Sequence, residues 1–107
     1  MKILAGDIGG TKTRLSLYQS RGRELLPARG EVFPSGSFSS LEEIIDKFLP
    51  TDSKNLGCAA FGVAGPVVDG RCQTTNLSWV VEVEKLRERL GIPEVFLMND
   101  LEATAFG

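Results

Sequence analysis

The first third of the chain shows two hydrophobic patterns that are typical of β-strands. Residues 2–8 contain a short continuous apolar run, which indicates a buried strand. After a glycine-rich break, residues 12–18 alternate with period two, with two leucines on the apolar face. These two segments are expected to form a hairpin. Residues 25–33 predict a weaker third strand, and Pro27 inside it indicates a sheet edge or a bulge.

The middle of the chain changes to the spacing of amphipathic helices. Apolar residues recur at i, i+3, i+4, i+7 and i+8, which predicts a helix that begins after Ser40 and ends at Pro50. Ser40 and Glu43 have the spacing of a capping box. The same periodicity over residues 82–90 predicts a second helix, and Gly91 is expected to end it.

Between and after these helices the pattern returns to strands. Residues 56–63 and 95–98 predict two buried strands. Asp69-Gly70 predicts a tight turn between the short segments 67–68 and 72–74. The last residues predict a helix of only about two turns, which is short for a complete domain. We therefore expect the chain to be the front part of a larger protein.

The composition is that of an ordinary globular protein. The 107 residues suit one domain, and 42% are apolar and 24% charged. The net charge of −2 argues against nucleic-acid and membrane partners. The absence of histidine excludes Ser-His-Asp and Cys-His catalysis and His-ligated zinc, so acid–base chemistry falls to groups such as carboxylates. Cys58 and Cys72 form no Cys-x-x-Cys pair and no targeting segment is visible, which predicts reduced structural thiols in a cytoplasmic protein.

A glycine-rich loop after the first strand is the first candidate site. Its adjacent Gly9 and Gly10 permit positive φ angles and close approach to the backbone, and successive N–H groups there can bind an anion. Thr11 and Lys12 add a hydroxyl and a cation, and the carboxylate of Asp7 could hold a hydrated Mg²⁺ near phosphates. The same residues also suit a plain hairpin turn. The spacing does not fit a Rossmann or Walker loop, and both of these require a helix where a strand is predicted.

A second candidate lies where the last strand is predicted to end. Asn99 and Asp100 are expected at the carboxyl edge of the sheet, where α/β proteins bind ligands. Asp100 could accept a proton from a substrate hydroxyl while Asn99 fixes the same substrate. Alternatively, Asn99 is a helix N-cap and Glu102 completes a capping box. Residues 62–66 and 75–79 also follow strands and suit a polyol, although turn chemistry and a tryptophan packed in the core explain them equally well.

Together these motifs resemble the amino-terminal small domain of bacterial glucokinases, sugar kinases of the hexokinase/actin/Hsp70 superfamily. The resemblance covers nearly the whole chain. It rests on Leu4-Ala5-Gly6-Asp7-Ile8-Gly9-Gly10-Thr11, Gly62-Val63-Ala64-Gly65-Pro66-Val67, Thr75-Asn76-Leu77-Ser78-Trp79, and Met98-Asn99-Asp100 followed by Glu102-Ala103. Lys12 differs from the asparagine often found there in glucokinases and resembles the ROK-type kinases. The resemblance implies an α/β fold of the ribonuclease H-like or actin-like ATPase type. Its mixed sheet would have three antiparallel N-terminal strands plus two parallel strands, with flanking helices.

The resemblance also implies a reaction, the ATP-dependent phosphorylation of glucose at its 6-hydroxyl to glucose 6-phosphate, with Mg²⁺. The phosphates of ATP would be bound by Gly6, Asp7, Ile8, Gly9, Gly10, Thr11 and Lys12. Asp7 would contact Mg²⁺ through water. Glucose would be bound by Asn99, Asp100, Ser78 and Asn76, with Asp100 as the catalytic base. Phosphoryl transfer needs mainly alignment and charge stabilisation, so a base, a phosphate cradle and Mg²⁺ suffice.

In this family a larger second domain supplies further contacts to both substrates. We therefore expect residues 1–107 to be the small domain alone, inactive because substrate alignment depends on closure between two domains. A helix of the family's small domain that returns from beyond these residues should leave an exposed apolar patch. Two other hypotheses stay open. One is a non-catalytic hexose-sensing module related to ROK-type proteins, and the other is an interaction protein that forms a homodimer through the patch.

Overall fold

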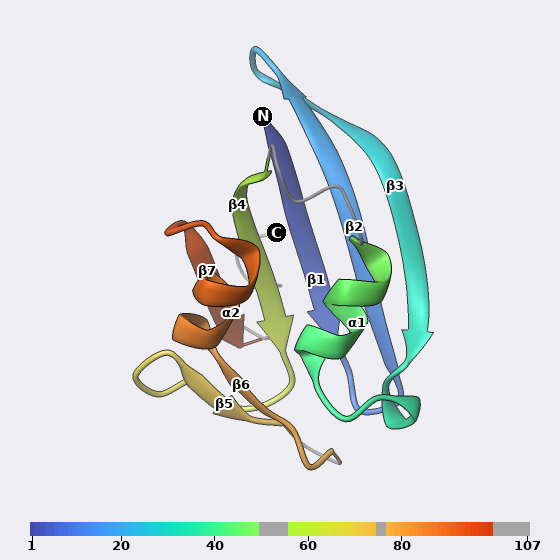
Figure 1. Cartoon of the computed structure of the whole chain (residues 1–107), viewed down its shortest axis with the longest axis vertical. Coiled ribbons are helices and arrows are strands. Elements are labelled where there is room, and N and C mark those ends of the chain that lie inside the picture. The colour runs from blue at the N-terminus through green and yellow to red at the C-terminus, as the bar shows by residue number, and fades with distance from the viewer. Residues whose placement is uncertain (50–55, 75–76, 100–107) are drawn as a thin grey trace.

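The computed structural model describes residues 1–49, 56–74 and 77–99, and its main feature is a five-stranded mixed sheet. The strand order is β3-β2-β1-β4-β7 (Figure 1). The five strands are β1 (Lys2–Ile8), β2 (Lys12–Arg21), β3 (Glu24–Pro34), β4 (Leu56–Val63) and β7 (Val95–Asn99). Strands β1, β2 and β3 pair antiparallel, whereas β4 pairs parallel with β1 and β7 pairs parallel with β4. The predicted mixed sheet is confirmed.

Strand β3 is longer than the sequence pattern predicts. It covers Glu24–Pro34, and every residue in it except Phe33 is exposed. The pairing with β2 shifts register between Leu17 and Tyr18, opposite the segment that contains Pro27. The predicted edge position and irregularity are therefore both present, and the missing hydrogen-bond donor of the proline costs little at a sheet edge.

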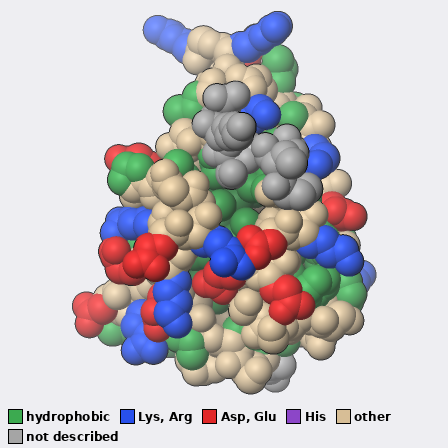
Figure 2. Space-filling view, in the orientation of Figure 1, with side chains coloured by type: hydrophobic (Ala, Val, Ile, Leu, Met, Phe, Trp, Pro, Cys, Tyr) green, Lys and Arg blue, Asp and Glu red, His purple; other side chains and the backbone are tan. Residues whose placement is uncertain are grey.

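Two helices, α1 (Leu41–Phe48) and α2 (Val83–Leu90), cover the same face of the sheet (Figure 1). The buried core lies between these helices and the inward residues of the strands. Figure 2 shows acidic and basic side chains close together over the helices, and Arg89 of α2 pairs there with Asp46 of α1. No helix of the described ranges covers the opposite face, on which Val32 and Phe96 are 47% and 51% exposed.

The ends of the helices follow the sequence signals, with one correction. Ser40 caps α1, because its side chain accepts a hydrogen bond from the Glu43 backbone N–H over 3.2 Å. The reciprocal half of the predicted capping box is absent, since the Glu43 carboxylate bonds the hydroxyl of Ser39 over 2.5 Å. Gly91 ends α2 in the left-handed conformation with φ 69°, as predicted.

A small second sheet differs from the prediction, which paired residues 72–74 with residues 67–68. It consists of β5 (Arg71–Gln73) and β6 (Val80–Glu82), which pair antiparallel. The predicted turn at Asp69-Gly70 exists, but only one isolated bridge, from Val68 to Arg71, pairs its arms. A three-residue strand is too short to show a period, so β6 left no signal in the sequence. Within the described residues, no helix is long and apolar enough to cross a membrane.

Candidate active site

The parallel strands β1, β4 and β7 end at one edge of the sheet. The register aligns Ile8 of β1 with Val63 of β4, and Val63 with Asn99 of β7. Neighbouring strands lie about 4.8 Å apart, so the backbones of Ile8 and Asn99 are separated by about 10 Å. The glycine loop after β1 and the predicted sugar-binding position at the end of β7 therefore share one edge, with β4 between them.

The glycine loop is a tight hairpin tip between β1 and β2. Gly9 N–H donates to the carbonyl of Lys12 over 2.9 Å, which leaves Gly10 and Thr11 at the tip. The backbone N–H groups of Gly10 and Thr11 donate to no acceptor in the part of the chain that the structure describes. Two amide donors are therefore available at the tip, which is the arrangement that an anion requires.

The physical reason for the glycines differs from the prediction. Neither Gly9 nor Gly10 has a positive φ. A Cβ atom at Gly9 would lie 2.9 Å from the Lys12 carbonyl oxygen, so the close approach of two backbone segments is what excludes a side chain there. The exposed Thr11 and Lys12 place their side chains at the tip, as the sequence predicts.

Two buried residues with hydroxyl groups, Ser35 and Thr13, support the glycine loop from the interior of the protein. The sequence analysis identified neither of them. The Ser35 hydroxyl donates to the carbonyl of Gly9 over 2.8 Å and lies 2.8 Å from the hydroxyl of Thr13. The Ser35 backbone N–H donates to the carbonyl of Thr11 over 3.0 Å. A signal existed for Thr13, because it lies in phase with the inward-facing Leu15 and Leu17. A polar residue at such a position needs a buried partner.

Two members of the predicted phosphate-binding segment have packing roles. Ile8 is 1% exposed and belongs to the core. Gly6 lies inside β1, where a Cβ atom would come within 2.5 Å of the Phe61 ring and 3.1 Å of Leu15. The Phe61 ring therefore occupies the space that a side chain at Gly6 would fill.

Asp7 is exposed on the sheet face opposite the helices, since it alternates with the buried residues of β1. Its register partners are Arg14 on β2 and Gly62 on β4. Its carboxylate forms no hydrogen bond or ion pair with the described residues, so its oxygens are open to solvent. No group of three or more metal-binding side chains occurs in residues 1–49, 56–74 and 77–99. The donor set fits a Mg²⁺ ion held through water and phosphate, which is how Mg²⁺ commonly binds, and not an ion enclosed by protein ligands.

Asn99 connects the end of β7 to the loop after β4. It is the last residue of β7, and its side-chain amide donates to the carbonyl of Gly65 in the loop after β4. Gly65 has a φ of 140°, a conformation that a residue with a Cβ atom rarely adopts. Asp100, the predicted base, lies outside the described residues, and so does the helix that Asn99 was expected to cap.

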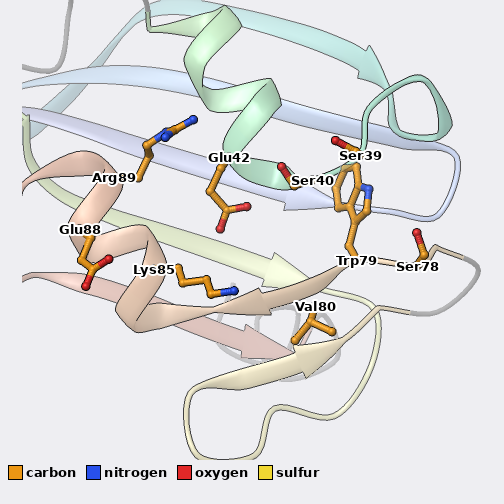
Figure 3. Close-up of a pocket in the computed structure, with 9 residues that line it drawn as sticks. All are labelled: Ser39, Ser40, Glu42, Ser78, Trp79, Val80, Lys85, Glu88 and Arg89. Atoms are coloured by element: carbon orange, nitrogen blue, oxygen red, sulfur yellow. The ribbon is translucent and has the colours of Figure 1, made fainter.

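Ser78 and Trp79 lie beside a separate cavity between the two helices (Figure 3). The cavity has a volume of about 660 Å³ and is lined by Ser39, Ser40, Glu42, Ser78, Trp79, Val80, Lys85, Glu88 and Arg89. No other predicted site residue within the described ranges lines it. Trp79 is 3% exposed and donates its indole N–H to the Phe38 carbonyl over 3.0 Å, so the core interpretation of this residue is confirmed. Asn76 lies outside the described residues.

The two cationic side chains that line this cavity, Lys85 and Arg89, are both paired with carboxylates. The hydrogen bond and the charge of Asp46 raise the pKa of Arg89, with a smaller contribution from the charge of Glu42. Lys85 lies 3.9 Å from a carboxylate oxygen of Glu82. One carboxylate oxygen of Glu42 is buried and has no hydrogen-bond partner among the described residues. The cavity therefore presents serine hydroxyls and the carboxylates of Glu42 and Glu88, not a cationic surface for phosphate.

Solved structures of sugar kinases share this fold. The glucokinase of an Antarctic psychrotroph superimposes with a TM-score of 0.83 at 29% identity, covering 98% of this chain and 34% of that protein. A ROK-family glucokinase of Streptomyces griseus, solved with glucose and AMPPNP, gives a TM-score of 0.67 at 25% identity, covering 98% of this chain and 35% of that protein. The fold thus defines the chain as a sugar-kinase domain of the actin-like ATPase fold.

Sequence comparison gives the family. The family model described as glucokinase matches residues 4–107, so the chain belongs to the glucokinase family. The curated glucokinase of Nostoc punctiforme is 40% identical over 111 residues, which cover 98% of this chain and 31% of that protein. The chain therefore spans about a third of the length of the curated relatives it matches.

Proposed function

We propose that residues 1–107 form the amino-terminal small domain of a glucokinase that transfers a phosphoryl group from ATP to the 6-hydroxyl of glucose. The observation that carries the proposal is the register Ile8–Val63–Asn99, which brings the glycine loop and the sugar-binding position to one sheet edge. A separation of about 10 Å between them leaves room for a terminal phosphate and the hydroxymethyl group of a hexose. Membership of the glucokinase family supports the same assignment.

On the nucleotide side, the N–H groups of Gly10 and Thr11, which donate to no acceptor among the described residues, bind phosphate oxygens, and the ammonium of Lys12 adds a positive charge. Gly6 and Ile8 contribute by fixing the strand that presents the loop. Asp7 holds Mg²⁺ through water. When Mg²⁺ is bound, it neutralises part of the negative charge on the phosphates.

On the sugar side, Asn99 and Asp100 bind glucose hydroxyls. Asp100 accepts the proton of the 6-hydroxyl as that oxygen attacks the terminal phosphorus of ATP. The Asn99 amide is held in place by its bond to the Gly65 carbonyl. Ser78 lines the separate cavity between the helices and Asn76 lies outside the described residues, so their contacts with glucose stay predictions.

The test is ADP release in the presence of glucose, ATP and Mg²⁺, by the full-length protein that carries this chain. Asp100→Asn should lower turnover by a factor of about 10²–10⁴, because a base acts mainly in the transition state. Its glucose affinity should stay within about tenfold of the unsubstituted protein. The matched control is Asp69→Asn, the same chemical change in an exposed turn, which should keep full turnover.

The chain of 107 residues alone is the second arm of this test. We expect it to release no ADP, since the other domain must close on the substrates. Turnover by the isolated chain that depends on Asp100 would contradict the half-site interpretation. Glucose binding by the full-length protein without any turnover would instead favour the hexose-sensing module.

A further inference from the structure

A buried hydrogen-bond network lies beneath the glycine loop. The Ser35 hydroxyl donates to the Gly9 carbonyl over 2.8 Å, and the Ser35 N–H donates to the Thr11 carbonyl over 3.0 Å. The side chains of Ser35 and Thr13 are fully buried, and their hydroxyl oxygens lie 2.8 Å apart. Ser35 has one hydroxyl hydrogen, which goes to Gly9, so Thr13 is the donor in the second bond.

The bond to the Gly9 carbonyl sets the direction of the next amide. The described residues contain no cis peptide bond, so the C=O of Gly9 and the N–H of Gly10 point in opposite directions across one planar peptide group. Ser35 draws the carbonyl toward the buried interior. The Gly10 N–H is therefore turned away from the interior, and it donates to no acceptor in the described ranges.

We propose that Ser35 is a positioning residue for nucleotide binding, a role that rests on the proposed kinase function. Its hydroxyl holds the Gly9 carbonyl inward and thereby directs the Gly10 N–H toward a phosphate of ATP. Thr13 keeps this arrangement by donating to Ser35, which leaves the Ser35 hydrogen for Gly9. Without the Ser35 hydroxyl, the Gly9 carbonyl loses its partner and the loop turns to hydrate it, because a buried polar group without a partner is costly.

The test compares Ser35→Ala with Ser37→Ala. Ser37 lies in the same 3₁₀ turn, is exposed, and makes no side-chain hydrogen bond within the described residues. Amide hydrogen exchange in this chain reports the order of the loop, since the Gly9 N–H is bonded to Lys12. KM for ATP and KM for glucose are measured in the full-length protein that carries the chain, and the affinity for ATP with Mg²⁺ is measured by calorimetry.

We expect Ser35→Ala to accelerate exchange at Gly9 by about tenfold or more. It should raise KM for ATP by about tenfold, the effect of one charge-assisted hydrogen bond, and leave KM for glucose within about twofold. Ser37→Ala should change none of these quantities. Thr13→Val should have a smaller effect than Ser35→Ala, and Thr13→Ser, which keeps the hydroxyl, should restore the ATP affinity. If Ser35→Ala does not fold, the comparison of Thr13→Val with Thr13→Ser tests whether the network beneath the loop controls ATP affinity.

The outcomes separate this proposal from the proposed function. Faster loop exchange with unchanged ATP affinity, in a protein that still phosphorylates glucose, would make Ser35 purely structural and overturn the proposal. An equal rise in KM for ATP and for glucose would do the same, because it would indicate a general loss of structure. If the unsubstituted full-length protein binds no ATP, the proposed function fails and the phosphate role of Ser35 fails with it.

Discussion

Replacement of Gly6 by alanine tests whether this glycine serves packing or the phosphate. A Cβ atom at position 6 would lie 2.5 Å from Cδ1 and 3.0 Å from Cε1 of Phe61, and 3.1 Å from a methyl group of Leu15. Carbon atoms prefer separations of about 3.5–4.0 Å, so the nearest contact is about 1 Å too short. Phe61 is fully buried and cannot turn into solvent, so the strands themselves must move.

The expected cost follows from two opposing effects. Overpacking a core by one methyl group costs about 1–3 kcal/mol, and the severity of this contact favours the upper half of that range. Alanine regains about 0.5–1 kcal/mol because glycine is unfavourable inside a strand. We therefore expect Gly6→Ala to lower the free energy of unfolding by about 1–2.5 kcal/mol, and Tm by about 4–8 °C for each kcal/mol.

Urea unfolding followed by circular dichroism measures this change. Gly36→Ala is the matched control, because a Cβ atom there meets nothing within 4 Å and φ is not positive, so it should be neutral or stabilise by up to about 1 kcal/mol. Phe61→Leu should reduce the cost of Gly6→Ala in a double-mutant cycle by about 1 kcal/mol, since it removes the clashing ring atoms. Equal stability of Gly6→Ala and Gly36→Ala would refute the packing argument. A folded Gly6→Ala protein should keep its ATP affinity if the role is packing.

Three further substitutions probe single contacts. Ser40→Ala removes the cap that accepts from the Glu43 N–H and should cost about 1 kcal/mol of unfolding free energy, and a change below about 0.3 kcal/mol would contradict the cap. Trp79→Phe leaves the partly buried Phe38 carbonyl without its indole donor and should cost about 1–3 kcal/mol by urea unfolding. An unchanged midpoint would mean that solvent replaces the bond. Gly10→Val blocks the close approach of a phosphate to the loop tip and should raise KM for ATP but not for glucose in the full-length protein. Unchanged ATP kinetics would contradict the assignment of phosphate binding to this loop.

Most of the fold could be predicted because its signals are local. Alternation over residues 12–18 and the helical stripe of α1 depend only on which face of an element is buried, and both elements bury those faces. The β5–β6 sheet could not be predicted in this way. Its strands have three residues each, and their pairing joins segments on either side of a loop. Likewise, Glu43 stands at the capping-box spacing from Ser40, but its carboxylate bonds Ser39. A pattern of residue types cannot tell which of the two neighbouring serines the carboxylate will bond.

The candidate site shows a similar division. The motif at the end of β1 predicts the loop and its exposed residues, because adjacent glycines between two strands indicate a tight turn and the polar Thr11 and Lys12 favour solvent. It does not predict what holds the loop, because Ser35 comes from a different part of the chain and meets Gly9 only when β3 has paired with β2. Chemistry-bearing residues can be found from the sequence, whereas the residues that orient them depend on tertiary contacts.

Strand β4 has a consequence for catalysis in the proposed kinase. It separates the glycine loop from Asn99 by one strand, which fixes about 10 Å between the two half-sites in a rigid, hydrogen-bonded frame. Reacting atoms must come within about 3–3.5 Å of each other, so the bound substrates themselves have to bridge the remaining space. Changes in the loops can alter the affinity for each substrate but not this spacing. Hence substitutions at Gly10 are expected to act on ATP alone, and a domain that closes over this sheet edge would align the substrates that bridge it.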